Sequence, residues 1–190
     1  MIALGADPIA AEVVAGWRDD LPGTYRVGLV VADDLGGGWT NRYAGEHGAR
    51  FPDSAEPKRL ADWIVVPLWT ADTPPTADRL RLEVRAALHR HAYIRRHGVA
   101  RTLREKLTQE GEVLARAGFA GPTLDAEELE YTRGVIAPLL DATDVATGVE
   151  VLFGDAAAAM LGFDARSLAV NAGLALALSE RGTVAGPSRS

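Results

Sequence analysis

The sequence contains no cysteine. This absence excludes disulfide bonds, thiolate metal sites and cysteine nucleophiles. No apolar run approaches the ~20 residues that a helix needs to cross a bilayer, so we expect no membrane segment. The first residues have neither a basic start nor a long apolar core. We therefore expect no signal peptide and a cytoplasmic protein.

Motifs that would name a reaction are also missing. There is no Gly-x-x-x-x-Gly-Lys loop, no Gly-x-Gly-x-x-Gly fingerprint and no Gly-x-Ser-x-Gly elbow. The four histidines include no His-x-x-x-His pair. His89 and His97 would lie about 12 Å apart along one helix, too far to share an ion. The spacing predicts no metal site and leaves any cofactor unknown.

What is present suits a globular protein. The chain has 190 residues, of which 47% are hydrophobic and 24% are charged, values typical of one domain. We expect a single, helix-rich α+β domain over residues 1–181 and a flexible tail over residues 182–190. Helices should pack against a small sheet formed mainly by the N-terminal third.

Patterns in that first third predict a helix, three strands and a loop. The expected ranges are a helix over 8–20, strands over 25–31, 39–43 and 62–70, and a loop over 45–58. Three glycines at 36–38 separate the first two strands and favour a hairpin. Pro67 cannot donate to a ladder, so the third strand should lie at a sheet edge.

The rest of the chain is mainly helical by pattern. Thr73 should cap a long helix that ends at Gly98, and capping boxes begin two more helices at Thr102 and Asp125. The expected ranges in the last third are a short strand over 149–153 and helices over 155–161 and 165–180.

The strongest signal is the position of the positive charge. Between Arg79 and Lys106 there are nine basic residues and two acidic ones, a formal charge of +7, although the whole chain carries −6. Such separation predicts association with an acidic protein partner, with a second copy of the chain, or with a small anionic ligand. The candidate ligand-binding residues are Arg42, Arg81, Arg85 and Arg96. The alternative is neutralisation within the chain by Glu127, Glu128 and Glu130.

A nucleic-acid partner is disfavoured. Two helices joined at Gly98 give the outline of a helix-turn-helix, and the first turn of the second helix is basic. The overall isoelectric point is about 5.2, however, whereas nucleic-acid-binding domains are usually basic or clearly striped.

A second hypothesis is a metal- or phosphate-dependent enzyme. Asp33 and Asp34 follow the predicted strand over 25–31 and precede the glycine run. Acidic pairs at a strand end can hold Mg²⁺. Arg42 would clamp an anion, and His47 or His89 would complete the site. The hypothesis requires these side chains to converge in a concave pocket.

Overall fold

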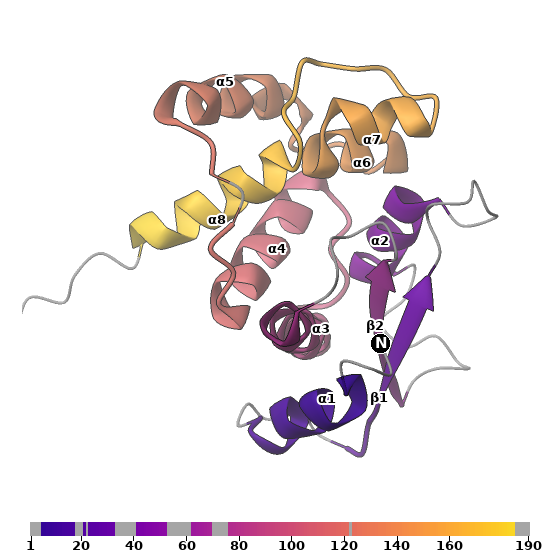
Figure 1. Ribbon diagram of the computed structural model, residues 1–190. Coiled ribbons are helices and arrows are strands. Elements are labelled where there is room, and N and C mark those ends of the chain that lie inside the picture. The colour runs from indigo at the N-terminus through magenta and orange to yellow at the C-terminus, as the bar shows by residue number, and fades with distance from the viewer. Residues whose placement is uncertain are drawn as a thin grey trace, which may run out of the picture. The chain divides into compact units, whose positions relative to one another are not determined.

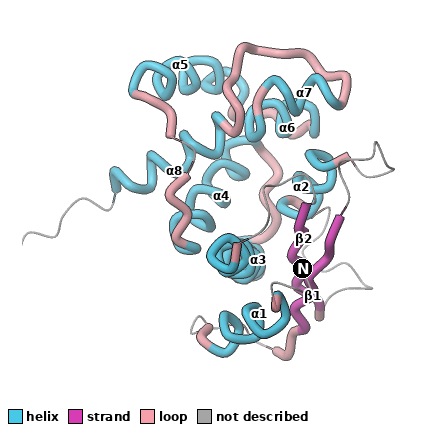
Figure 2. The backbone as a smooth tube through the Cα atoms, in the orientation of Figure 1, coloured by secondary structure: helices cyan, strands magenta, loops and turns pink. Residues whose placement is uncertain are grey.

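The computed structural model describes residues 5–17, 21, 23–32, 41–52, 62–69, 76–121 and 123–184. These residues form eight α-helices, one 3-10 helix and two strands (Figures 1 and 2). The predicted helix-rich α+β fold, with a small sheet from the N-terminal third, is therefore confirmed. The chain divides into two compact units, Met1–Val99 and Ala100–Ser190. The single domain over residues 1–181 stays a prediction.

The first unit is built around two parallel strands. Its elements are α1 (Ala6–Ala15), β1 (Arg26–Ala32), α2 (Arg42–Arg50), β2 (Trp63–Trp69) and α3 (Ala77–His97). β1 pairs with β2 in parallel, so that Val27 lies opposite Ile64 and Val30 lies opposite Pro67. Parallel strands need a crossover connection rather than a tight turn, and α2 lies within that connection.

The predicted hairpin is wrong. Residues 39–43 were expected to pair with the first strand, but α2 begins at Arg42 and β1 pairs with β2 instead. Asn41 caps α2 by accepting a hydrogen bond from the Ala44 backbone N–H at 3.1 Å. This local cap outweighs a short polar–apolar alternation. The predicted loop over 45–58 is also wrong as far as residue 50, and the glycines at 36–38 lie outside the described residues.

Helices α1 and α3 bury one face of the sheet. The buried cluster joins Ala10 and Val13 of α1, Ile64 and Val66 of β2, and the α3 face that includes Leu80, Val84, Ala87 and Leu88. Val27 and Leu29 of β1 pack against the same cluster. The α3 side chains recur at intervals of three and four residues, which is the spacing of one helix face.

The second unit is entirely helical in its described part. Its elements are α4 (Leu103–Ala117), α5 (Ala126–Ile136), the 3-10 helix η2 (Ala137–Leu139), α6 (Val145–Phe153), α7 (Asp155–Met160) and α8 (Ala172–Val184). Both capping boxes, Thr102 with Glu105 and Asp125 with Glu128, are present. Leu103, Ile136, Val151, Leu168 and Leu176 belong to one buried cluster that joins α4, α5, α6 and α8.

Two predicted elements of this unit are wrong. Residues 149–153 are the end of α6 and not a strand. The six residues from Gly148 to Phe153 are all buried, and a segment buried on every side has no period that separates strand from helix. The last helix begins at Ala172 rather than at 165. It continues to Val184, past the expected boundary at 181, and residues 185–190 lie outside the description.

Candidate binding surface on helix α3

Helix α3 carries much of the positive charge on a firmly packed scaffold. Thr76 caps it by accepting a hydrogen bond from the Arg79 backbone N–H at 3.1 Å, whereas the expected cap, Thr73, lies outside the described residues. Gly98 ends the helix with a φ of +84°, a conformation that glycine adopts without strain. Because the apolar face of α3 is packed in the core, the arginines on its other faces are held by a well-packed helix.

Several of the predicted cations are neutralised locally. Arg79 pairs with Glu83 one turn later at 2.5 Å. Arg81 contacts Asp78 at 3.1 Å and reaches Glu12 of α1 at 3.3 Å. Arg81 was a candidate ligand-binding residue, and the structure instead places it in an exposed network of carboxylates. A ligand would have to displace those contacts.

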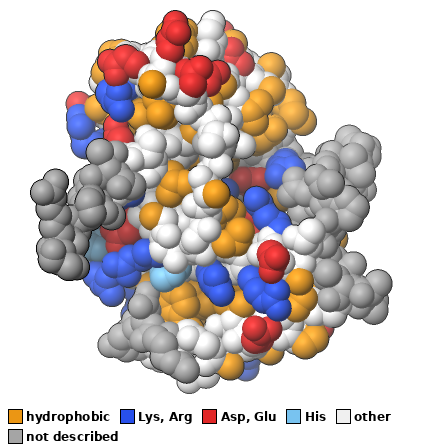
Figure 3. All heavy atoms as spheres, turned by 60° about the vertical axis from the view of Figure 1, so that its left-hand side comes forward, with side chains coloured by type: hydrophobic (Ala, Val, Ile, Leu, Met, Phe, Trp, Pro, Cys, Tyr) orange, Lys and Arg blue, Asp and Glu red, His pale blue; other side chains and the backbone are white. Residues whose placement is uncertain are grey.

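Arg85 and Arg96 differ from these neighbours. Both are exposed, and neither side chain forms a hydrogen bond or an ion pair with any residue that the structure describes. They are 11 residues apart, which places them on the same helix face, about 16 Å apart along the axis. We call Arg85 and Arg96 the arginine pair. Figure 3 shows one face of the molecule where several basic side chains reach the surface beside a histidine.

The acidic residues predicted to neutralise this charge have other uses. The Glu128 carboxylate accepts a hydrogen bond from the Asp125 backbone N–H at 3.0 Å and completes the capping box of α5. Glu130 forms an ion pair with Arg133 on the same helix. Two of the three predicted internal partners are therefore engaged within α5.

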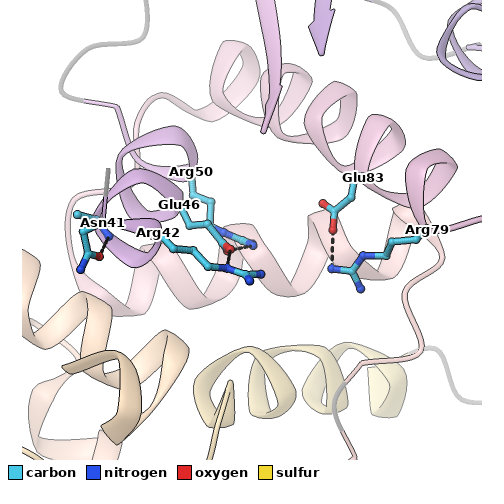
Figure 4. A network of polar contacts seen from close by, with 7 residues as sticks. Asn41, Arg42, Glu46, Arg50, Arg79 and Glu83 are labelled. Atoms are coloured by element: carbon cyan, nitrogen blue, oxygen red, sulfur yellow. Dashed lines mark hydrogen bonds and ion pairs between the residues drawn. The ribbon is translucent and has the colours of Figure 1, made fainter. Parts of the chain in front are cut away.

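Arg42 lies in a separate cluster on α2 (Figure 4). Its Nε atom contacts Glu46 at 2.9 Å, and the Arg50 guanidinium contacts the other carboxylate oxygen at 3.0 Å. The Arg42 guanidinium also lies 5.8 Å from the centre of the Trp69 ring. Burial raises the pKa of Glu46, but the charges and hydrogen bonds of Arg50 and Arg42 outweigh it and hold the pKa below its usual value. An anion clamped by Arg42 would compete with this ionised carboxylate.

The enzyme hypothesis finds no assembled site among the described residues. Asp33 and Asp34 lie outside them. His47 is buried in α2 with its ring 5.1 Å from Phe51, and the His89 ring lies 4.6 Å from Trp17. Both histidines pack against aromatic rings, and the described part of the chain holds no cluster of three or more potential metal ligands.

His91 is a partly buried histidine of α3. Its ring lies 4.6 Å from Tyr25, edge to face, and its buried Nε2 atom has no hydrogen-bond partner in the described structure. Burial, followed by the charge of Arg95, lowers the pKa of His91. The signal that could have found it is a histidine on the apolar face of a helix, with a cation four residues later.

We expect His91 to make the first unit less stable in mild acid. Because its pKa is lowered by folding, the unfolded chain binds a proton first as the pH falls below about 6.5. The free energy of unfolding should therefore be unaffected by His91 above about pH 6.5, and should decrease between that pH and the lowered pKa. Urea unfolding between about pH 7 and pH 5 should show a smaller decrease in H91Q. An unchanged decrease in H91Q, or an equal change in the exposed-site control H97Q, would contradict this assignment.

Comparison with known proteins adds no identification. No protein-family model, curated protein or solved structure matches the chain. None of the described helices combines the length and apolar character needed to span a bilayer.

Proposed function

We propose that the protein is an association module that binds an acidic surface of a partner protein through α3. The observation that carries this proposal is the arginine pair, Arg85 and Arg96, which is exposed on one helix face without ion-pair partners in the described structure. Neighbouring cations show that the chain can supply carboxylates, since Arg79 pairs with one and Arg81 with two. The arginine pair keeps its charge available for another molecule.

The spacing favours a protein surface over a small ion. A separation of about 16 Å along the helix is several times the width of a phosphate or sulfate, so one such ion cannot contact both guanidinium groups. Two carboxylates on a partner can, and the planar guanidinium groups can each bind a carboxylate through two N–H donors. Charge complementarity of this kind accelerates association and fixes register.

The proposal predicts binding that salt weakens and that Arg85→Ala with Arg96→Ala removes. A labelled glutamate-rich peptide serves as the acidic probe, and fluorescence anisotropy measures its binding at about 50 mM and about 300 mM NaCl, where screening lengths differ strongly. We expect at least a tenfold loss of affinity in the double variant. Circular dichroism should be unchanged, because both side chains are exposed.

A matched control separates the surface from net charge. Ala159→Glu with Ala165→Glu lowers the net charge by the same two units, at exposed positions outside α3. This control should keep the affinity of the wild type within a factor of about two. Equal losses in both variants, or no loss in the arginine variant, would defeat the proposal. Competition by millimolar sulfate at either salt concentration would instead indicate a site for a small anion.

A further inference from the structure

The backbone of β1 has one edge without a strand partner among the described residues. The Arg26 N–H donates to the Asp62 carbonyl at 2.7 Å. In a parallel ladder the residues that face the neighbouring strand alternate, so residues 26, 28, 30 and 32 direct their backbone groups toward β2. Val27, Leu29 and Val31 direct theirs away from it. Among the described residues, no backbone group bonds to that side of β1.

The outer edge of β2 is interrupted by a proline. By the same alternation, Trp63, Val65, Pro67 and Trp69 direct their backbone groups away from β1. Pro67 has no N–H. Because its backbone nitrogen faces away from β1, the β1–β2 ladder loses no hydrogen bond, and the outer edge of β2 loses one donor. Proline at this position is a common way to block strand addition. The two edges of the sheet therefore differ, and only β1 offers a full row of donors and acceptors.

We infer that the β1 strands of two copies of this chain pair in antiparallel orientation. With Leu29 opposite Leu29 of the second copy, Val27 lies opposite Val31 in both directions. Each of these three pairs exchanges two backbone hydrogen bonds, about six in total. This register is the one that uses every outward-facing group of Val27, Leu29 and Val31.

The side chains fit this register. Val30 is 47% exposed and would lie opposite Gly28 of the second copy, a large residue against a small one. Val31 is 53% exposed and would lie beside Val27, forming a β-branched cross-strand pair. Arg26 would lie opposite Ala32, which places the two Arg26 side chains at opposite ends of the interface. Like charges are therefore kept apart, and the most exposed apolar residues of β1 are covered.

The pairing is also self-limiting. It creates a four-stranded sheet in the order β2–β1–β1–β2, related by a twofold axis. Its two outer edges are those of β2, and each carries Pro67. A twofold interface uses the same patch of each subunit and closes after two copies. The predicted product is a dimer and not a fibre. This inference uses a different surface from the arginine pair and does not depend on the proposed function.

Sedimentation analysis of the full chain with Val31→Pro tests the inference. The Val31 N–H points away from β2, so proline there removes no bond from the β1–β2 ladder but removes two from the dimer. We expect the dimer dissociation constant to rise at least tenfold. Val31→Lys is a second variant for the case in which circular dichroism shows that proline disturbs the fold, because this exposed position accepts a charge. The control is Val65→Lys, which is 40% exposed on β2 and outside the pairing edge.

The outcomes are distinct. The inference is supported if Val31→Pro or Val31→Lys weakens the dimer and Val65→Lys does not. It is also supported by concentration-dependent protection of the Val27, Leu29 and Val31 amides from hydrogen exchange. A chain that stays monomeric up to its solubility limit overturns it, as does a dimer that both Val31 variants leave unchanged. Strand pairing should respond little to salt, so its failure is distinguishable from failure of the salt-sensitive binding proposed for α3.

Discussion

Replacing Gly111 by alanine is expected to lower the free energy of unfolding of the second unit by about 3 kcal/mol, at the upper end of overpacking effects. Gly111 lies in α4 and packs against α8. An added Cβ would lie 2.5 Å from the Ala177 carbonyl oxygen and 3.0 Å from its carbon. Both are backbone atoms within a helix, so they cannot rotate away as a side chain could. The two helices would have to separate, which opens the core on either side.

The control is the same substitution on an unobstructed helix. Gly134 is exposed in α5, and an added Cβ would meet nothing within 4 Å. Gly134→Ala should therefore stabilise the protein by about 0.5–1 kcal/mol through helix propensity alone. Urea titrations followed by circular dichroism measure both variants. If Gly111→Ala is as stable as the wild type, α4 and α8 are not in the close contact described.

Local signals in the sequence predicted the starts of α4 and α5 and the end of α3. Thr102 and Asp125 were identified as caps from one pattern each, and both capping boxes are present. The end of α3 at Gly98 was likewise visible, because a glycine after a long amphipathic run favours a C-cap. These features depend on residues within one helical turn of each other, so the sequence contains all the information that they need.

Strand partners depended on contacts that the sequence does not display. The segment over 62–70 was recognised as a strand with Pro67 at an edge, but nothing in either segment specifies parallel pairing with β1. A hairpin between the strands predicted over 25–31 and 39–43 was favoured only because short connections commonly join antiparallel strands. The real connection contains α2, which Asn41 caps. Pairing over this distance is decided by the shared burial of Ile64 and Val66 beneath α1 and α3.

On the candidate surface of α3, too, the sequence indicates contacts within one helix but not contacts between distant residues. The sequence indicates a basic stretch and even the Arg79–Glu83 pair, whose members are one turn apart. It does not reveal that Arg81 reaches Glu12, 69 residues away. That contact is one reason why Arg81 is occupied, whereas Arg85, four residues later, is not. The arginine pair could therefore be selected only after the packing of α1 against α3 was known.

Replacing Arg166 by alanine is expected to destabilise the second unit by about 3 kcal/mol, the low end of the cost of breaking a buried ion pair. The Glu150 side chain is 4% exposed and its Oε2 atom contacts the Arg166 Nε at 2.9 Å. Its buried Oε1 atom has no hydrogen-bond partner in the described structure. Without Arg166, the Glu150 carboxylate would remain in the core with no ion-pair partner among the described residues. The low end applies because Arg166 itself is 43% exposed, so water can partly replace it.

A second substitution should reverse this loss. Glu150→Met in the Arg166→Ala background removes the stranded charge and fills a similar volume with apolar atoms, so most of the lost stability should return. Arg133→Ala is the control: its ion pairs with Glu130 and Glu180 are exposed, and their removal should cost less than about 1 kcal/mol. Chemical denaturation of the wild type, Arg166→Ala, Glu150→Met and the double variant gives the coupling between Glu150 and Arg166. If the double variant is as unstable as Arg166→Ala alone, the loss arises from the packing of the arginine stem over α6 and not from the buried charge.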